Sequence, residues 1–501
     1  MSSDMHRPTG RIQRVCREGK DVQSAALFSR DPFIVATNED SIKPDKSSRK
    51  FIRHQVMRGK NRKRVASQKP TLGSWVNHGH HGPAWQLPAT KTWLHEDPLS
   101  PRLSLQVNGS TPSVTGFAVE MEPNMLQLIY DSPNTTPGSV ITVMRKAMYP
   151  IESCIDLRKD EQHWFEDLTH DPAYAHTVLC CAHSYFDIVK SETLEFSAIR
   201  HVNKTLIPLQ KKLAESNLVI TDSTIFTVLA LAMISEALGD LDAAKKHILG
   251  LHQLIKLRGG MAALFQKHVL QIKCCRLDLR IALKTGSKPL LFSDDTVSWK
   301  TYLFDPQKVS TMTPLHTLCK APDIRLVNVW LDLREFTTAV NLAHQTQRKI
   351  FPGLFQEALI SVQYRLQQLA YHNHDKQEIL RVAMIAFSAN IFLESHSISA
   401  HYRHLAGQLR IILQSQEQHD DDELLRVTLW FIFIGKVSVL DGPEDTPWLE
   451  QRLLTTSRAL GLTGWAETRQ VLKSLLWVDV VNDQAGKKFF DDAKNLEVVP
   501  P

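Results

Sequence analysis

Residues Thr221–Phe265 read TDSTIFTVLALAMISEALGDLDAAKKHILGLHQLIKLRGGMAALF and carry the clearest helical pattern of the 501-residue chain. A polar pair, Asp222-Ser223, precedes a run of apolar residues and supplies a side chain suited to cap a helix. That helix is expected to reach Leu238 and to stop at Gly239, because glycine readily adopts the left-handed conformation found at helix ends.

The second half of the stretch predicts another helix, which begins near Asp240 or Asp242 and ends at Arg258. A turn this short requires the two helices to lie antiparallel. Gly259 and Gly260 are expected to let the chain turn, and Arg258 to pair with a nearby carboxylate or with helix carbonyls. The apolar residues recur at spacings of three and four and form one stripe: Leu241, Ala244, Ile248, Leu251 and Ile255.

The same periodicity continues toward the C-terminus and outward from this hairpin. Asp171-Pro172 predicts a helix start, with Asp171 as the cap and Pro172 at the first position. Val427–Val439 is apolar nearly all round, which predicts a central, enclosed helix. Further helices are expected at Lys376–Ser395, Asp422–Leu440, Trp448–Leu460 and Glu467–Val478, and an apolar stripe at Phe355, Leu359, Val362, Leu366 and Leu369. The predicted fold class is therefore all-α, a multi-helix domain of antiparallel hairpins over residues 139–495.

Residues 1–120 differ from the rest in pattern and in charge. They lack sustained periodicity and are rich in turn-forming residues, so we expect a largely disordered basic arm with a short helix near 48–64. The first 100 residues hold eighteen Lys/Arg against nine Asp/Glu, a net charge of +9, whereas the whole chain has +6 and residues 101–501 therefore −3. Such asymmetry favours an acidic polymer as a partner of the arm.

The charge of the arm is concentrated between Arg49 and Lys69, which contains nine Lys/Arg and no acid. Lys60–Arg64 is typical of a nuclear import signal. Contacts of such cations with phosphates release counterions and give affinity that does not depend on sequence. Three interpretations stay open: import alone, import with nucleic-acid contact, or a solvated arm. The candidate site residues are Arg49, Lys50, Arg53, Arg58, Lys60, Arg62, Lys63 and Arg64.

Several classes of protein are not favoured by the sequence. Seven cysteines, two pairs of them adjacent, do not form the framework of a disulfide-rich secreted protein. The most apolar stretch, Val427–Leu440, is about 14 residues long and includes Lys436, too short for a bilayer span of roughly 20. Phosphate-loop, dinucleotide, nucleophile-elbow and kinase motifs are absent. We therefore expect no membrane partner, no catalytic residues, no metal site and no cofactor, and predict that the chain is not an enzyme.

Two N-terminal patches resemble the fungal-specific transcription-factor-like proteins. Phe33–Asn38 is similar to the short apolar segment that precedes the basic helix of that family. Arg53-His54-Gln55-Val56-Met57-Arg58 is similar to its R-x-H-V-M-R motif, with Gln55 where histidine is more usual.

A third patch lies in the helical region. Ala243–Gly260 is similar to the family segment H-x-x-G-L-x-x-[ML]-[VI]-x-x-R-G-G. Cys275–Ala282, followed by Pro289, resembles its D-L-x-x-A…P continuation. The resemblance implies a helical regulatory domain in which Arg258-Gly259-Gly260 has no catalytic role.

The family regulatory domain is often joined to a binuclear zinc-cysteine cluster that binds DNA. That cluster needs six closely spaced cysteines, and residues 1–150 contain only Cys16. Sequence-specific DNA binding is therefore not implied for this chain. Because family members often lie beside biosynthetic genes, the resemblance implies a regulator of secondary metabolism.

The function predicted from the sequence is a nuclear transcriptional regulator or co-regulator. Its expected partners are DNA, bound nonspecifically through the basic arm, and other transcription regulators or a second copy of the chain. The alternative is a helical scaffold or ligand-binding module without direct DNA recognition.

Overall fold

A computed structural model describes residues 117–120, 151–155, 168, 170–191, 193–215, 219–304, 312–372, 375–393, 402–415 and 421–498. Within these ranges every regular element is a helix, and the only β pairing is an isolated bridge between Ile155 and Ile350. The predicted all-α class is thus confirmed. The basic arm up to residue 116, with the helix expected near 48–64, lies outside the described residues.

The first two long helices form an antiparallel hairpin, α5 (Pro172–Ser191) and α6 (Phe196–Ala214). The predicted start of α5 is confirmed, since the Asp171 carboxylate accepts a hydrogen bond of 3.2 Å from the backbone N–H of Tyr174. The same carboxylate pairs with Lys212 at 2.7 Å and so ties the end of α6 to the start of α5.

The hairpin predicted from Thr221–Phe265 is present as α7 (Asp222–Ala237) and α8 (Leu241–Arg258). Gly239 has a φ of +78°, as its place at the helix end requires. The cap of α7 differs from the prediction: Thr221, not Asp222 or Ser223, accepts the hydrogen bond from the N–H of Thr224.

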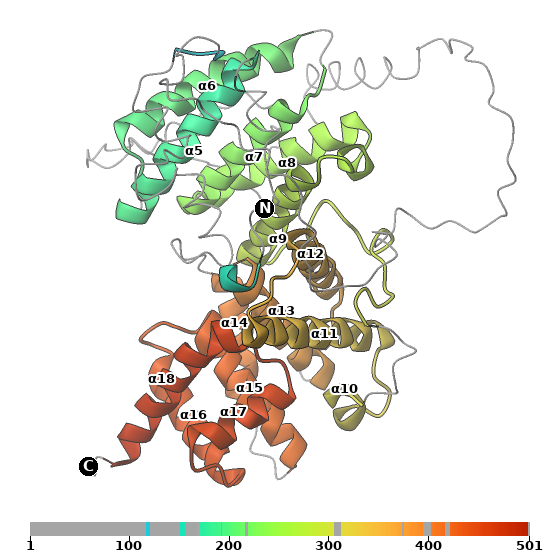
Figure 1. Cartoon of the computed structure of the whole chain (residues 1–501), viewed down its shortest axis with the longest axis vertical. Coiled ribbons are helices and arrows are strands. Elements are labelled where there is room, and N and C mark those ends of the chain that lie inside the picture. The colour runs from blue at the N-terminus through green and yellow to red at the C-terminus, as the bar shows by residue number, and fades with distance from the viewer. Residues whose placement is uncertain are drawn as a thin grey trace, which may run out of the picture. The chain divides into compact units, whose positions relative to one another are not determined.

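Helix α9 (His268–Thr285) follows the short η4 (Met261–Leu264) and links the early helices to the later ones. It contacts α7 and α8 on one side and α12 and α14 on the other, as Figure 1 shows near the middle of the ribbon. Because it is covered from both directions, eleven of its eighteen residues are buried. Charged groups on α9 must therefore find partners inside the protein.

The remaining α-helices follow α9 along the chain (Figure 1). In order they are α10 (Pro314–Leu318), α11 (Ile324–Thr346), α12 (Pro352–Gln368), α13 (Lys376–Phe392), α14 (Arg403–Ser415), α15 (Asp422–Ser438), α16 (Thr446–Ala459), α17 (Trp465–Ser474) and α18 (Asp479–Val498). The helices predicted from Lys376, Asp422 and Trp448 are confirmed within two or three residues. The one predicted over Glu467–Val478 ends early, at Ser474, and α18 begins at Asp479.

Helix α15 occupies the centre of the largest apolar cluster. It contacts α10, α13, α14, α16, α17 and α18, and residues 427–435 are all buried. Trp430 packs edge-to-face on Trp330 and against Phe387. The enclosed helix predicted from Val427–Val439 is therefore confirmed. No helix among the described residues is long and apolar enough to cross a membrane.

Residues 286–304 contain no helix, although they lie within the region 139–495 that was predicted to be helical. Gly286, with a φ of +71°, closes α9, and proline at 289 cannot continue a helical hydrogen-bond ladder. This connector is fixed instead by buried side chains of the helices beside it.

Candidate functional site

The eight predicted site residues all fall in the arm, outside the described residues. They remain a prediction from sequence.

A second basic region is present between residues 196 and 285. It holds thirteen Lys/Arg against six Asp/Glu, a net charge of +7. Residues 101–195 before it hold six against thirteen, a net charge of −7. The sum over residues 101–501 is close to neutral and conceals this region. A charge count over windows of about one helical hairpin would have found it.

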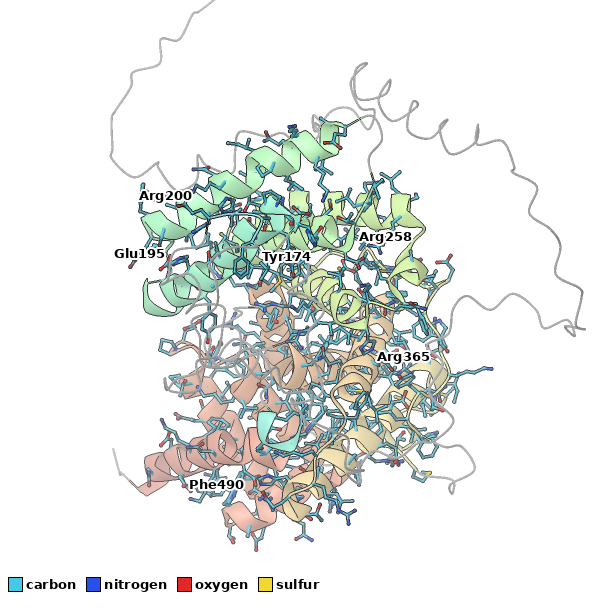
Figure 2. The ribbon with its side chains drawn as sticks, turned by 45° about the horizontal axis from the view of Figure 1, so that its top comes forward. Tyr174, Glu195, Arg200, Arg258, Arg365 and Phe490 are labelled. Atoms are coloured by element: carbon cyan, nitrogen blue, oxygen red, sulfur yellow. The ribbon has the colours of Figure 1, made fainter. Side chains whose placement is uncertain are left out.

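Part of the charge of this region lies on the surface of α6. The helix contains four Lys/Arg and no acid. Arg200, Lys204 and Lys211 are exposed, and Phe196 and Ile207 on the same outer face are 72% and 71% exposed. Figure 2 shows Arg200 at the outer edge of the ribbon, pointing away from the other helices. The face thus combines positive charge with apolar side chains.

The inner face of α6 carries a histidine cluster that the sequence analysis did not identify. His201 is buried, and its Nδ1 lies 3.2 Å from Nδ1 of His176 on α5, so one ring donates to the other. The ring of His183 stacks on His201 at 5.5 Å. Burial, with positive charges nearby, lowers the pKa of His176 and His201 to about 4. These rings are neutral near pH 7, so Arg200 and Lys204 supply the positive charge there.

The Arg-Gly-Gly segment at the end of α8 is a structural turn. Arg258 pairs with Asp222 at the start of α7, which confirms the expected carboxylate partner, and Lys267 reaches the same carboxylate at 3.2 Å. Gly259 and Gly260 have φ values of +122° and +83°. The motif therefore closes the α7–α8 hairpin through a charge pair and two residues that need glycine.

Replacing Gly260 by Ala tests this assignment. With φ +83° and ψ −173°, Gly260 lies in a region open almost only to glycine, so Gly260→Ala is expected to cost about 1–3 kcal/mol of unfolding free energy. Gly407→Ala is the matched control, because Gly407 lies inside α14 with nothing within 4 Å of an added Cβ. It should stabilise the protein by about 0.5–1 kcal/mol. Equal effects of the two substitutions in urea unfolding would contradict the assignment.

Two cations of α9 enclose one buried carboxylate of α7. Glu236 is 2% exposed and lies 3.0 Å from Arg280 and 2.5 Å from Lys284. Burial alone would raise the pKa of Glu236, but the two cations hold that pKa below its ordinary value. The cluster stays charged near pH 7 and joins α9 to α7.

The patch that resembles the D-L-x-x-A…P motif also has a structural role. The buried Asp278 accepts hydrogen bonds of 2.9 Å from the N–H groups of Leu290 and Leu291, directly after the buried proline at 289. Tyr364 of α12 donates to the same carboxylate at 2.8 Å. Asp278 therefore fixes the start of the 286–304 connector. This structural role accounts for the presence of both an aspartate and a following proline in the motif.

A second buried carboxylate fixes the other end of the connector. Asp332 of α11 accepts hydrogen bonds from the N–H groups of residues 302–304 at 2.7–3.1 Å. Its charge is balanced by Arg365 of α12, at 2.6 Å, and both side chains are at most 1% exposed. Neighbouring residues of α12, Tyr364 and Arg365, thus complete two clusters that hold one loop.

The remaining groups that could react or bind a metal are the cysteine thiols and the buried carboxylates. The six described cysteines are free thiols. Burial raises the pKa of each, to about 11 for Cys181 and about 12 for Cys274, so they remain protonated near pH 7. In the described ranges, no three His, Cys, Asp or Glu side chains are grouped as metal ligands. The buried carboxylates Glu236, Asp278 and Asp332 are occupied in structural contacts.

Comparison with known proteins adds no relative. No protein-family model, no curated protein and no solved structure matches the chain. The resemblance to fungal-specific transcription-factor-like proteins therefore rests on the residues quoted from the sequence.

Proposed function

We propose that this chain is a nuclear transcriptional regulator or co-regulator of a fungal secondary-metabolite gene cluster. The observation that carries the proposal is the segment Arg49–Lys69, with nine cations, no acid and the family-like motif Arg53–Arg58. In this proposal Lys60–Arg64 serves nuclear import, and the arm as a whole contacts DNA through its phosphates. The all-α body is the regulatory part.

The physical support is electrostatic. Like charges at this density repel one another and are stabilised by a polyanion, whose counterions are released on binding. Such contacts carry no base information, and the zinc-cysteine cluster that would read a sequence is missing from residues 1–150. Selection of target genes is then assigned to partner regulators bound by the body.

Neutralising the import signal is expected to abolish nuclear accumulation. The variant replaces Lys60, Arg62, Lys63 and Arg64 by Gln in the full chain fused to a fluorescent protein, and the nuclear-to-cytoplasmic ratio is measured in fungal cells. Lys487→Gln/Lys488→Gln is the control, because both lysines are exposed on α18. Nuclear accumulation that persists in the four-residue variant would contradict the assignment of the signal.

DNA contact by the arm is tested through its salt dependence. The logarithm of the binding constant should fall linearly with the logarithm of salt concentration, and each phosphate-binding cation removed should reduce the slope by about 0.9. Replacing Arg49, Lys50, Arg53 and Arg58 by Gln should therefore flatten the slope by roughly 3 to 4, for duplexes of any sequence. A chain that binds no duplex, and whose deletion changes no gene cluster, would instead be a scaffold or ligand-binding module.

A further inference from the structure

We propose that the outer face of α6 binds an acidic amphipathic helix of a protein partner. The surface consists of Phe196, Arg200, Lys204, Ile207 and Lys211. The proposal does not depend on nuclear import or on DNA contact by the arm, because the face lies on the helical body, to which the proposed function assigns the binding of partner regulators.

The face has two parallel stripes. At 3.6 residues per turn, Ile207 lies about three turns after Phe196 and Ala214 five turns after it, so these three apolar residues align along the helix. Arg200, Lys204 and Lys211 align beside them and span about 16 Å at 1.5 Å per residue. Asn203 and Gln210, both exposed, line the opposite edge of the apolar stripe. Positive charge therefore lies on one side only.

The outer face is not needed for the packing of α6. The helix contacts mainly α5, and its buried residues all lie on the inner side: Ala198, His201, Val202, Thr205 and Leu209. Phe196 and Ile207 remain more than 70% exposed. The guanidinium of Arg200 lies 5.0 Å from the centre of the Phe196 ring, which places charge directly beside the first apolar residue. Figure 2 shows this end of α6 at the outside of the ribbon.

Charge complementarity favours an acidic partner with an apolar stripe of its own. A DNA backbone would pair with the three cations but would leave Phe196 and Ile207 without apolar contact. An anionic membrane would favour cations on both sides of the apolar stripe, whereas Asn203 and Gln210 occupy one side. A partner helix with apolar residues three and four apart and carboxylates along one edge can contact both stripes, since its apolar residues pack on Phe196 and Ile207 and its carboxylates pair with the cations.

The outer face of α8 provides a contrast within the same basic region. It exposes three lysines, Lys245, Lys246 and Lys256, but its apolar residues are less exposed, 39% for Leu249 and 56% for Leu257. A variant that changes the same number of basic residues on α8 therefore serves as a control. It shows whether a loss of binding in the α6 variant is specific to α6 or follows from lower positive charge in general.

The test uses the full chain and a fluorescent, designed helical peptide of 19 residues, the length of α6. The peptide has leucines at helical spacing and glutamates along one edge. A second peptide has the same composition with the leucines scattered, and a third has lysine for glutamate. Fluorescence anisotropy near physiological salt measures binding, and circular dichroism checks that each variant is folded.

The acidic amphipathic peptide should bind at least about tenfold more tightly than the other two peptides. Arg200→Glu/Lys204→Glu/Lys211→Glu and Phe196→Ser/Ile207→Ser should each weaken its binding by about tenfold or more, equivalent to 1.4 kcal/mol. The matched Lys245→Glu/Lys246→Glu/Lys256→Glu variant should change it less than about threefold. The arm is the same in all of these proteins, so a failure here leaves the import and DNA tests unaffected.

Three results would overturn the proposal. The first is equal weakening by the α6 and α8 charge variants, which would mean that only net charge matters. The second is equal binding of the scattered peptide, which would remove the role of the apolar stripe. The third is binding of a DNA duplex or of anionic vesicles that is stronger than peptide binding and is lost in the α6 variants, which would assign the face to a polyanion or a membrane surface.

Discussion

Asp332→Ala is expected to lower the free energy of unfolding by about 3–5 kcal/mol, enough to unfold a substantial fraction of a marginally stable protein. The substitution leaves the guanidinium of Arg365 buried, with no more than 1% of its side chain exposed, and without its carboxylate at 2.6 Å. An uncompensated buried cation is costly because the interior cannot solvate it as water does.

The loss should exceed that of an ordinary ion pair because Asp332 also holds the connector. Its oxygens accept hydrogen bonds from the N–H groups of Tyr302, Leu303 and Phe304, and Arg365 donates to the carbonyl of Lys300 at 3.2 Å. Removing the carboxylate therefore leaves backbone donors unpaired in the interior, each worth about 1–3 kcal/mol when orphaned. We expect residues 300–304 to become more accessible to proteolysis and hydrogen exchange.

Two further variants make this prediction specific. Asp332→Leu/Arg365→Met removes both charges and should recover part of the lost stability, but not all of it, since the N–H groups of residues 302–304 remain unpaired. Asp491→Ala removes the partner of Lys487 in an exposed pair on α18 and should cost less than about 1 kcal/mol. Urea unfolding followed by circular dichroism provides the comparison. Similar midpoints for Asp332→Ala and Asp491→Ala would contradict the prediction.

The helices that the sequence predicted best begin at a local capping signal. In α8, Asp240 caps the start with a hydrogen bond to the N–H of Ala243, and Gly259 closes the end. In α13, Asp375 caps the start in the same way. Such signals act within a few residues, so they can be read without knowing the tertiary structure. The error at α7, where Thr221 is the cap, is only one residue.

The connector was not predictable because its partners are distant in sequence. Asp278 and Tyr364 are 86 residues apart, and Asp332 and Arg365 are 33 apart. Each aspartate lies in a sequence that is typical of an ordinary helix. Its neighbouring residues do not indicate that its carboxylate is buried against backbone N–H groups. The break between α17 and α18 has a related cause, since Asn341 of α11 bonds to the backbone at residues 477 and 479.

The two basic regions differ in how clearly the sequence reveals them. The arm residues from Arg49 to Arg64 stood out because nothing acidic lies among them. The cations of α6 did not stand out, because the acidic residues before residue 196 balance their charge when the net charge is summed over the whole body. Their exposure depends on which side of α6 packs against α5, and that is a tertiary property.

Trp430→Ala is expected to cost about 3–5 kcal/mol of unfolding free energy, the range for removing a large buried aromatic side chain. Trp430 is fully buried in α15 and packs edge-to-face on Trp330, with ring centroids 5.6 Å apart. Its indole N–H donates to the carbonyl of Leu476 at 2.7 Å, so the side chain also fixes the turn between α17 and α18. The substitution opens a cavity between α11, α13 and α15 and leaves that carbonyl without its donor.

Trp430→Phe separates these two contributions. It retains most of the apolar contact but removes the N–H, and should cost about 1–3 kcal/mol for the unpaired carbonyl together with a small cavity. Phe265→Ala is the control, because Phe265 is 76% exposed and its removal should change the stability by less than about 0.5 kcal/mol. The urea midpoint is expected to be lowest for Trp430→Ala, higher for Trp430→Phe and highest for Phe265→Ala. Both the burial of the indole and its hydrogen bond to Leu476 contribute to stability. Equal midpoints for Trp430→Phe and the unmodified chain would show that the bond to Leu476 contributes nothing to stability.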